Sequence, residues 1–175
     1  MSVETEPSQK SDGLAGYAPP SERPPLAWYA GLAGVFSAGM TGALVAARAS
    51  DRELPERIGP GDLVLVGTAS HKLSRLIAKD KVTAFLRAPF TRYEGTAGPA
   101  ELDESPRGTG AQRAVGEMLA CPYCLGLWAS AGFHVGLLFA PRPTRFAASI
   151  LSALTISDFL QIAYKAAEDR GLGGS

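Results

Sequence analysis

The sequence has few cysteines and no excess of charge. Its two cysteines, Cys121 and Cys124, form a single Cys-x-x-Cys pair, which excludes the dense disulfide framework of small secreted domains. The formal net charge is zero, so no surplus of Lys and Arg indicates a nucleic-acid partner. The chain also lacks a glycine-rich phosphate loop, a serine-nucleophile elbow and a zinc-protease helix motif. These absences favour a protein that is not an enzyme.

Charged side chains are also absent from long parts of the sequence. No Lys, Arg, Asp or Glu occurs from Met118 to Pro141, a stretch long enough to cross a hydrocarbon core about 30 Å thick. After a turn at residues 142–145, a second apolar run follows, interrupted only by Asp158 and small polar residues. The two runs predict a tight hairpin of transmembrane helices at residues 121–141 and 146–164.

A further uncharged stretch lies between Arg23 and Arg48 and predicts a first transmembrane helix at residues 26–47. It follows a polar N-terminal tail, residues 1–25, which is rich in Pro, Ser and Glu and which we expect to be disordered. The overall prediction is an all-α integral membrane protein with three to four transmembrane helices. Its principal partner is then the lipid bilayer.

Small residues recur every fourth position on the predicted helices. Gly34 and Gly42 lie on such a stripe in the first helix, and Gly132 and Gly136 lie on another in the hairpin. Gly and Ala allow helices to approach closely. In lipid, helices associate through such van der Waals packing, because the hydrophobic effect does not drive them together. We expect these stripes to pack against the protein's own helices, although they could also support a homo-oligomer or contacts with other membrane proteins.

Residues 62–79 predict a helix that is both apolar and basic, with Asp62 placed to cap its start. Its basic face is formed by four residues: His71, Lys72, Arg75 and Lys79. Such a helix can lie at the headgroup boundary with its cations toward anionic lipid, or it can cross the bilayer. A Lys or Arg at the centre of a transmembrane helix costs about 2.5–3.5 kcal/mol, so we expect the interfacial position.

The segment at residues 80–117 mixes basic residues, Gly and Pro, and predicts a loop with short helices, one started by a capping box of Thr109 and Gln112. Within it, residues 95–110 predict a mobile loop. Lys and Arg are concentrated between Arg48 and Arg113. The positive-inside rule therefore predicts a multi-pass protein of the cell membrane with residues 80–117 and the C-terminus in the cytoplasm. Residues 165–175 are polar and predict a frayed C-terminal tail.

The two cysteines are the residues best suited to redox chemistry or metal binding. Cys121-Pro122-Tyr123-Cys124 resembles the active-site motif of glutaredoxins, but no strands precede it, so we exclude a glutaredoxin fold. A thiol-redox role stays open as an alternative. A zinc site needs about four ligands, so zinc could be held only in a symmetric dimer or with a remote ligand such as His71. The simplest interpretation is that no cofactor is bound and that the pair shapes the entrance of a helix.

Two ionisable residues lie within the predicted hairpin. His134 falls in the middle of its helix, and Asp158 lies nearer the cytoplasmic end of the next one. Such residues are functional candidates because charge is costly in lipid. A single His and a single Asp do not form a proton or ion path, and the count of residues from the turn argues against a direct pair between them.

Three parts of the sequence together resemble an uncharacterised family of small bacterial membrane proteins, domain of unknown function 1360. They are His71-Lys72-Leu73-Ser74-Arg75-Leu76-Ile77, Phe85-Leu86-Arg87-Ala88-Pro89-Phe90, and Leu119-Ala120-Cys121-Pro122-Tyr123-Cys124-Leu125-Gly126-Leu127-Trp128. The likeness covers residues 62–164, and the family includes Bacillus proteins linked to sporulation. It implies a non-enzymatic envelope or differentiation protein that acts through protein contacts, and it supplies no catalytic residue.

Overall fold

The computed structural model describes residues 17–19 and 23–172. Most of the predicted disordered tail lies outside this range. The elements in chain order are α1 (Leu26–Ala49), α2 (Pro60–Ala78), a 3-10 turn η1 (Lys81–Thr83), α3 (Ala84–Arg87), β1 (Thr91–Thr96), β2 (Leu102–Pro106), α4 (Gly110–Leu119), α5 (Pro122–Phe139) and α6 (Pro141–Leu172).

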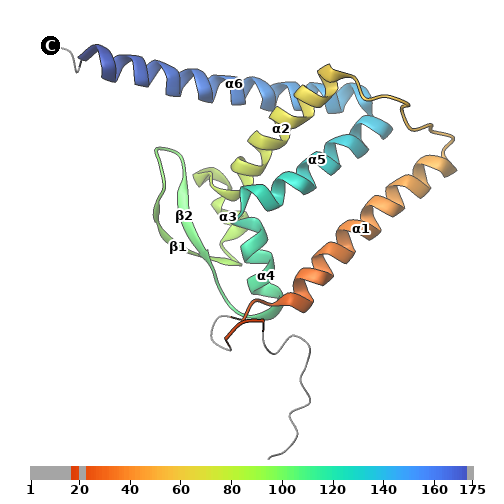
Figure 1. Cartoon of the computed structure of the whole chain (residues 1–175), viewed down its shortest axis with the longest axis horizontal. Helices are drawn as coiled ribbons and strands as arrows, with labels where there is room; N and C mark the ends of the chain where they lie inside the picture. The colour runs from red at the N-terminus through yellow and green to blue at the C-terminus, as the bar shows by residue number, and fades with distance from the viewer. Residues whose placement is uncertain (1–16, 20–22, 173–175) are drawn as a thin grey trace, which may run out of the picture.

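The four long helices form one group, with α4 and a small β-hairpin at one end (Figure 1). α2 is central, because it packs against both α5 and α6. Its buried positions are mostly small and recur at helical spacing: Val66, Ala69, Ser70, Ser74 and Ala78. Small side chains bring the helix axes close together, as expected for helices that associate without a large hydrophobic core.

Three helices are long and apolar enough to cross a membrane: α1, α5 and α6. Few of their side chains are buried within the protein, and large apolar residues such as Val35 and Phe159 are more than 60% exposed. A water-soluble domain rarely leaves so much apolar surface uncovered. The predominantly helical prediction is therefore confirmed at this level, and the apolar surfaces are compatible with a membrane protein.

The strictly all-α prediction is wrong, because residues 80–117 contain an antiparallel β-hairpin. β1 pairs with β2 from Thr91 opposite Pro106 to Thr96 opposite Leu102, with a bulge between Tyr93 and Gly95. Residues 95–110, for which the sequence predicts a mobile loop, therefore contain the turn of this hairpin and the whole of β2. Together with η1, α3 and α4 the hairpin forms a small cap, residues 80–119, at the C-terminal end of α2 (Figure 1).

The turn between α5 and α6 is even shorter than predicted. α5 ends at Phe139 and α6 begins at Pro141, because proline is well tolerated in the first turn of a helix. Residues 142–145 are therefore helical and do not form the turn. α6 also continues to Leu172, so residues 165–172 extend the helix and are not a frayed tail.

Two predicted helix caps are absent. α2 begins earlier than expected, with Gly59 at its N-cap and no side-chain cap bond, and Asp62 lies inside its first turn. Thr109 is the N-cap residue of α4 but also makes no side-chain cap bond. The Gln112 side chain instead donates to the Pro89 carbonyl, 2.9 Å away, and so ties α4 to the cap.

Candidate functional site

A row of ion pairs runs along α2. Its cations meet carboxylates from α6 and from the β-hairpin: Lys72 with Asp158, Arg75 with Glu101, and Lys79 with Asp103. The Lys72–Asp158 contact is 2.6 Å long and Lys72 is only 17% exposed. Three of the four cations of the basic face that the sequence assigns to anionic lipid are therefore paired with carboxylates of the same chain, and its contact with lipid stays a prediction.

The fourth member of that face, His71, has a different environment. Its ring stacks on Phe159 of α6, with centroids 6.3 Å apart. His71 also lines, with Lys72, Arg75 and Asp158, a cavity of about 630 Å³ between α2, α6 and the hairpin turn. Positive and negative groups alternate around this cavity, so it carries no clear preference for an anion or a cation.

Hydroxyl groups join α2 and α6 on the N-terminal side of the Lys72–Asp158 pair in both helices. Thr68 donates to the Ser152 hydroxyl at 2.8 Å, and Ser152 donates to the Leu65 carbonyl at 3.0 Å. Thr155 donates to the Thr68 carbonyl, also at 3.0 Å. At the start of both helices, Arg145 forms a two-pronged pair with Asp62, at 3.0 and 2.8 Å. We call this set of polar contacts, together with the Lys72–Asp158 pair, the α2–α6 seam.

A buried ion pair fixes the cap to the end of α2, and sequence reasoning did not find it. Arg87 is fully buried and pairs with Glu104 of β2, whose side chain is only 6% exposed. Arg87 also donates to the carbonyls of Ile77 and Asp80. A charge at this depth is tolerated only when its hydrogen bonds are satisfied. The sequence signal that could have indicated this pair is an arginine inside the apolar stretch from Phe85 to Phe90.

The two cysteines lie together at the entrance of α5. Cys121 is the N-cap residue, and its sulfur accepts a hydrogen bond from the Cys124 amide at 3.2 Å. The two sulfurs are 2.6 Å apart and both thiols are free. Among the residues that the structure describes, no three His, Cys, Asp or Glu side chains gather as a metal site. His71 therefore does not join the pair, and the role that the contacts give to Cys121 is that of a helix cap.

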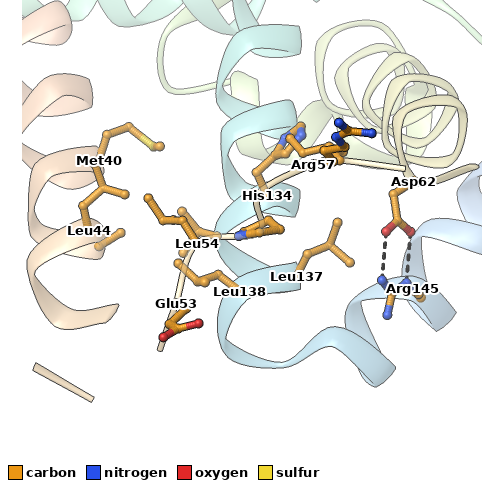
Figure 2. Close-up of a pocket in the computed structure, with 14 residues that line it drawn as sticks. Met40, Leu44, Glu53, Leu54, Arg57, Asp62, His134, Leu137, Leu138 and Arg145 are labelled. Carbon is orange, nitrogen blue, oxygen red and sulfur yellow. Dashed lines mark hydrogen bonds and ion pairs between the residues drawn. The ribbon is translucent and has the colours of Figure 1, made fainter. Parts of the chain in front are cut away.

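His134 and Asp158 occupy separate sites. The Nδ1 atom of His134 lies 2.8 Å from the Ser130 carbonyl within α5, whereas Asp158 faces Lys72. His134 instead lines a cavity between α1, α5 and the loop that joins α1 to α2 (Figure 2). The structure gives no continuous polar path between the two residues.

The packing of α1 is looser than that of the other long helices. Its side-chain contacts with other helices lie in its first half, where the Tyr29 hydroxyl donates to Glu117 of α4 and Phe36 meets Trp128 of α5 edge to face, 5.2 Å between centroids. A Cβ added at Gly34 or Gly42 would meet no atom within 4 Å. The expectation that this stripe packs against the protein's own helices is therefore wrong.

The two glycines of the stripe in the hairpin differ in their surroundings. A Cβ on Gly136 would lie 2.7 Å from the Thr144 hydroxyl of α6, whereas one on Gly132 would meet nothing within 4 Å. Gly136 therefore permits the one-residue turn at Ala140, and Gly132 has no such role. Within the described residues, close packing of α5 on α6 depends on the end of the hairpin and not on the whole stripe.

Comparison with known proteins places these elements in a family of unknown function. The UPF0713 protein YngL of Bacillus subtilis is 33% identical over 99 residues, which span 53% of this chain and 72% of that relative. The sporulation protein YjcA of the same species is 35% identical over 76 residues, 42% of this chain and 64% of YjcA. The match therefore spans slightly less than two thirds of YjcA. No solved structure matches the chain.

The family model described as Protein of unknown function (DUF1360) matches residues 65–164. This range contains most of α2, the cap, α5 and most of α6, and it leaves α1 and Asp62 outside. The ion pairs of Lys72, Arg75 and Lys79 and the cysteine pair thus lie within the shared region. On this evidence, the chain belongs to the DUF1360 family.

Proposed function

We propose that this chain is a four-span membrane protein in which α1, α2, α5 and α6 all cross the bilayer. The observation that carries the proposal is the position of α2 between α5 and α6. Its length of 19 residues corresponds to about 28 Å at 1.5 Å per residue, close to the thickness of a hydrocarbon core. Pairing of Lys72 with Asp158 offsets the cost that first favoured an interfacial position.

The four-span arrangement also assigns the sides of the membrane. The start of α1 contacts α4 through Tyr29 and Glu117, so the N-terminal end of α1 and the cap belong to the same side. The concentration of Lys and Arg in the central region puts that side in the cytoplasm. The loop at residues 50–59 and the turn at Ala140 then face outward.

We further propose that the protein acts without catalysis, through contacts that it makes in the cell envelope. The supporting features are a cap held rigidly by Arg87 and Glu104 and the similarity to a relative named as a sporulation protein. By this analogy, the protein serves a sporulation or differentiation programme.

Cysteine accessibility tests the arrangement. In a Cys121→Ser, Cys124→Ser background, we expect a thiol placed at Glu56 to react with a membrane-impermeant maleimide from outside intact cells. A thiol placed at Gly98, in the hairpin turn, should react only after lysis. Labelling of both positions from outside, or of neither before lysis, would overturn the four-span proposal.

Complementation tests the function. Deletion of the gene in its host should impair the differentiation programme, and the double Cys→Ser variant should restore it fully. Arg87→Leu, which undermines the cap, should not restore it. Failure of the double Cys→Ser variant at normal protein levels would instead indicate that the thiols carry the function.

A further inference from the structure

A short helix in the cap has its charged side chain inside and its apolar side chains outside. Residues 81–87 form one helical segment, η1 followed by α3, beside the C-terminal end of α2 (Figure 1). Within it, the Arg87 side chain is fully buried, whereas Val82 and Phe85 are 73% and 72% exposed. In folded proteins arginine is mostly exposed, and valine and phenylalanine are often buried. The segment therefore reverses the usual distribution of polar and apolar side chains.

The free carbonyls at the end of α2 explain why polar side chains of this segment turn inward. The last four carbonyls of a helix have no partner within that helix. The Thr83 hydroxyl donates to the Leu76 carbonyl, and Arg87 donates to the Ile77 carbonyl at 2.5 Å. Residues four apart share one side of a helix. The side that carries Thr83 and Arg87 is therefore occupied by the end of α2.

The opposite side of the segment is apolar and uncovered. Val82, Phe85 and Leu86 have the spacing of one helix face, and all three are exposed. We call these three residues the apolar face of the cap. They are three of the four large apolar side chains exposed in residues 80–119, all of which the structure describes, and the fourth is Tyr93. Apolar exposure in the cap is therefore concentrated beside the end of α2.

The depth of the apolar face in a membrane follows from the same hydrogen bonds. In the proposed arrangement, α2 ends at the cytoplasmic surface of the bilayer. Leu76 and Ile77 belong to the last turn of α2, and one helical turn rises about 5.4 Å. A segment hydrogen-bonded to both carbonyls is therefore held close to the boundary between headgroups and acyl chains. Apolar side chains at this level meet lipid instead of bulk water.

We propose that the apolar face of the cap inserts into the cytoplasmic leaflet, an inference that rests on the proposed four-span arrangement. Val82, Phe85 and Leu86 then act as the apolar side of an interfacial helix does, and the upper parts of phospholipid acyl chains cover them. The partner is a phospholipid surface without a required headgroup, because the face itself carries no charge. The cap is thereby held against the membrane.

The surroundings of the apolar face favour lipid over a protein partner. The two charged residues that precede it are engaged within the chain. Asp80 accepts a hydrogen bond from the Val82 amide, and Lys81 donates to the Pro99 carbonyl, both at 3.0 Å. A protein interface usually surrounds its apolar centre with a polar rim that bonds to the partner. Insertion into a bilayer needs no such rim.

Tryptophan fluorescence in vesicles tests the insertion. The full chain carries Trp28→Phe and Trp128→Phe, which remove its two natural tryptophans. It is reconstituted in phosphatidylcholine vesicles with and without bromine on the acyl chains, because bromine quenches tryptophan on contact. Phe85→Trp should emit at shorter wavelength than a tryptophan in water and should be strongly quenched by the brominated lipid. Val82→Trp reports on the same face and should behave alike, so a folding defect in one variant leaves the other.

Two further variants calibrate the measurement. Arg92→Trp is the matched control, because Arg92 is an exposed residue of β1 in the same cap. It should emit as in water, and its quenching should be several-fold weaker than that of Phe85→Trp. Val35→Trp is the membrane reference, because Val35 is exposed on α1, and it should be strongly quenched.

The outcomes separate this inference from the membrane proposal. Quenching of Phe85→Trp and Val82→Trp no stronger than that of Arg92→Trp would overturn the inference. Emission at short wavelength without quenching would also overturn it, because protein, such as a second copy of this chain, would then cover the face. In both cases strong quenching of Val35→Trp would leave the membrane proposal standing. Absence of quenching at Val35 as well would overturn both.

Discussion

The two sides of this molecule are held together by different means. On one side, α2 and α6 meet along the α2–α6 seam, where hydroxyls and the Lys72–Asp158 ion pair cross between the helices. On the other, α1 meets α4 and α5 through a few side-chain contacts in its first half and leaves cavities along its length. In lipid, apolar surface alone does not drive helices together. The polar seam therefore fixes the core, and α1, outside the matched family region, is an attachment to it.

The cap meets the C-terminal end of α2 at the buried Arg87, whose replacement should have the largest effect. Arg87→Leu leaves Glu104 buried without its partner, so the free energy of unfolding should fall by about 3–5 kcal/mol. Denaturant titration in detergent measures this loss. Arg92→Leu, on the exposed part of β1, is the control and should change little. A small loss in Arg87→Leu would show that the cap contributes little to the fold.

The ion pair of the seam should give the next largest effect. Lys72→Met leaves Asp158 without its cation and should lower the free energy of unfolding by about 1.5–3 kcal/mol. Exchanging the two residues, as Lys72→Asp with Asp158→Lys, should recover part of the loss, because the opposite charges again face each other. If the exchange is no better than either single change, the pair does not join α2 to α6.

The two glycine stripes provide a direct comparison between the tight and loose sides. Gly136→Ala places a methyl group against Thr144 and should cost about 1–3 kcal/mol through overpacking. Gly34→Ala, in the open stripe of α1, should change the free energy of unfolding by less than about 0.5 kcal/mol. Both are measured by the same titration. A large cost at Gly34 would instead indicate a partner on α1.

The hydroxyl contacts should give the smallest effect that is still measurable. Thr155→Val preserves the shape of the side chain and removes its hydrogen bond to the Thr68 carbonyl. Single interhelical hydrogen bonds in membrane proteins contribute about 0.6 kcal/mol on average, so a loss of that size is expected. Ser149→Ala, whose hydroxyl bonds only to its own helix, is the control. If both variants lose the same free energy of unfolding, the interhelical hydrogen bond of Thr155 does not stabilise the fold.

The apolar helices could be predicted from the sequence because length and the absence of charge are local properties. The partners of the charged residues could not, because Lys72 and Asp158 are 86 residues apart and meet only once α2 is placed against α6. The β-hairpin was missed for a related reason. Its strands carry charges on both faces, as at the adjacent Asp103 and Glu104 of β2, so the usual alternation of apolar and polar residues is absent.

The site residues likewise include some whose role follows from the local sequence and others whose surroundings depend on distant elements. The capping position of Cys121 follows from its place before Pro122, a pattern typical of a helix start. Glu53, Arg57 and His134 line one cavity from a loop and a distant helix, and nothing in the local sequence predicts that cavity. The ion pairs of the basic face could not be predicted, because the sequence pattern shows each cation alone while its carboxylate partner lies on a distant element.

The unusual length of α6 has a mechanical consequence. Its 32 residues extend about 48 Å at 1.5 Å per residue, well beyond a hydrocarbon core of about 30 Å. In a membrane, a helix longer than the hydrocarbon core tilts or extends beyond it. In the proposed membrane arrangement, the α2–α6 seam holds the first half of α6, so a bilayer of different thickness would change the tilt of α6 and displace its C-terminal end.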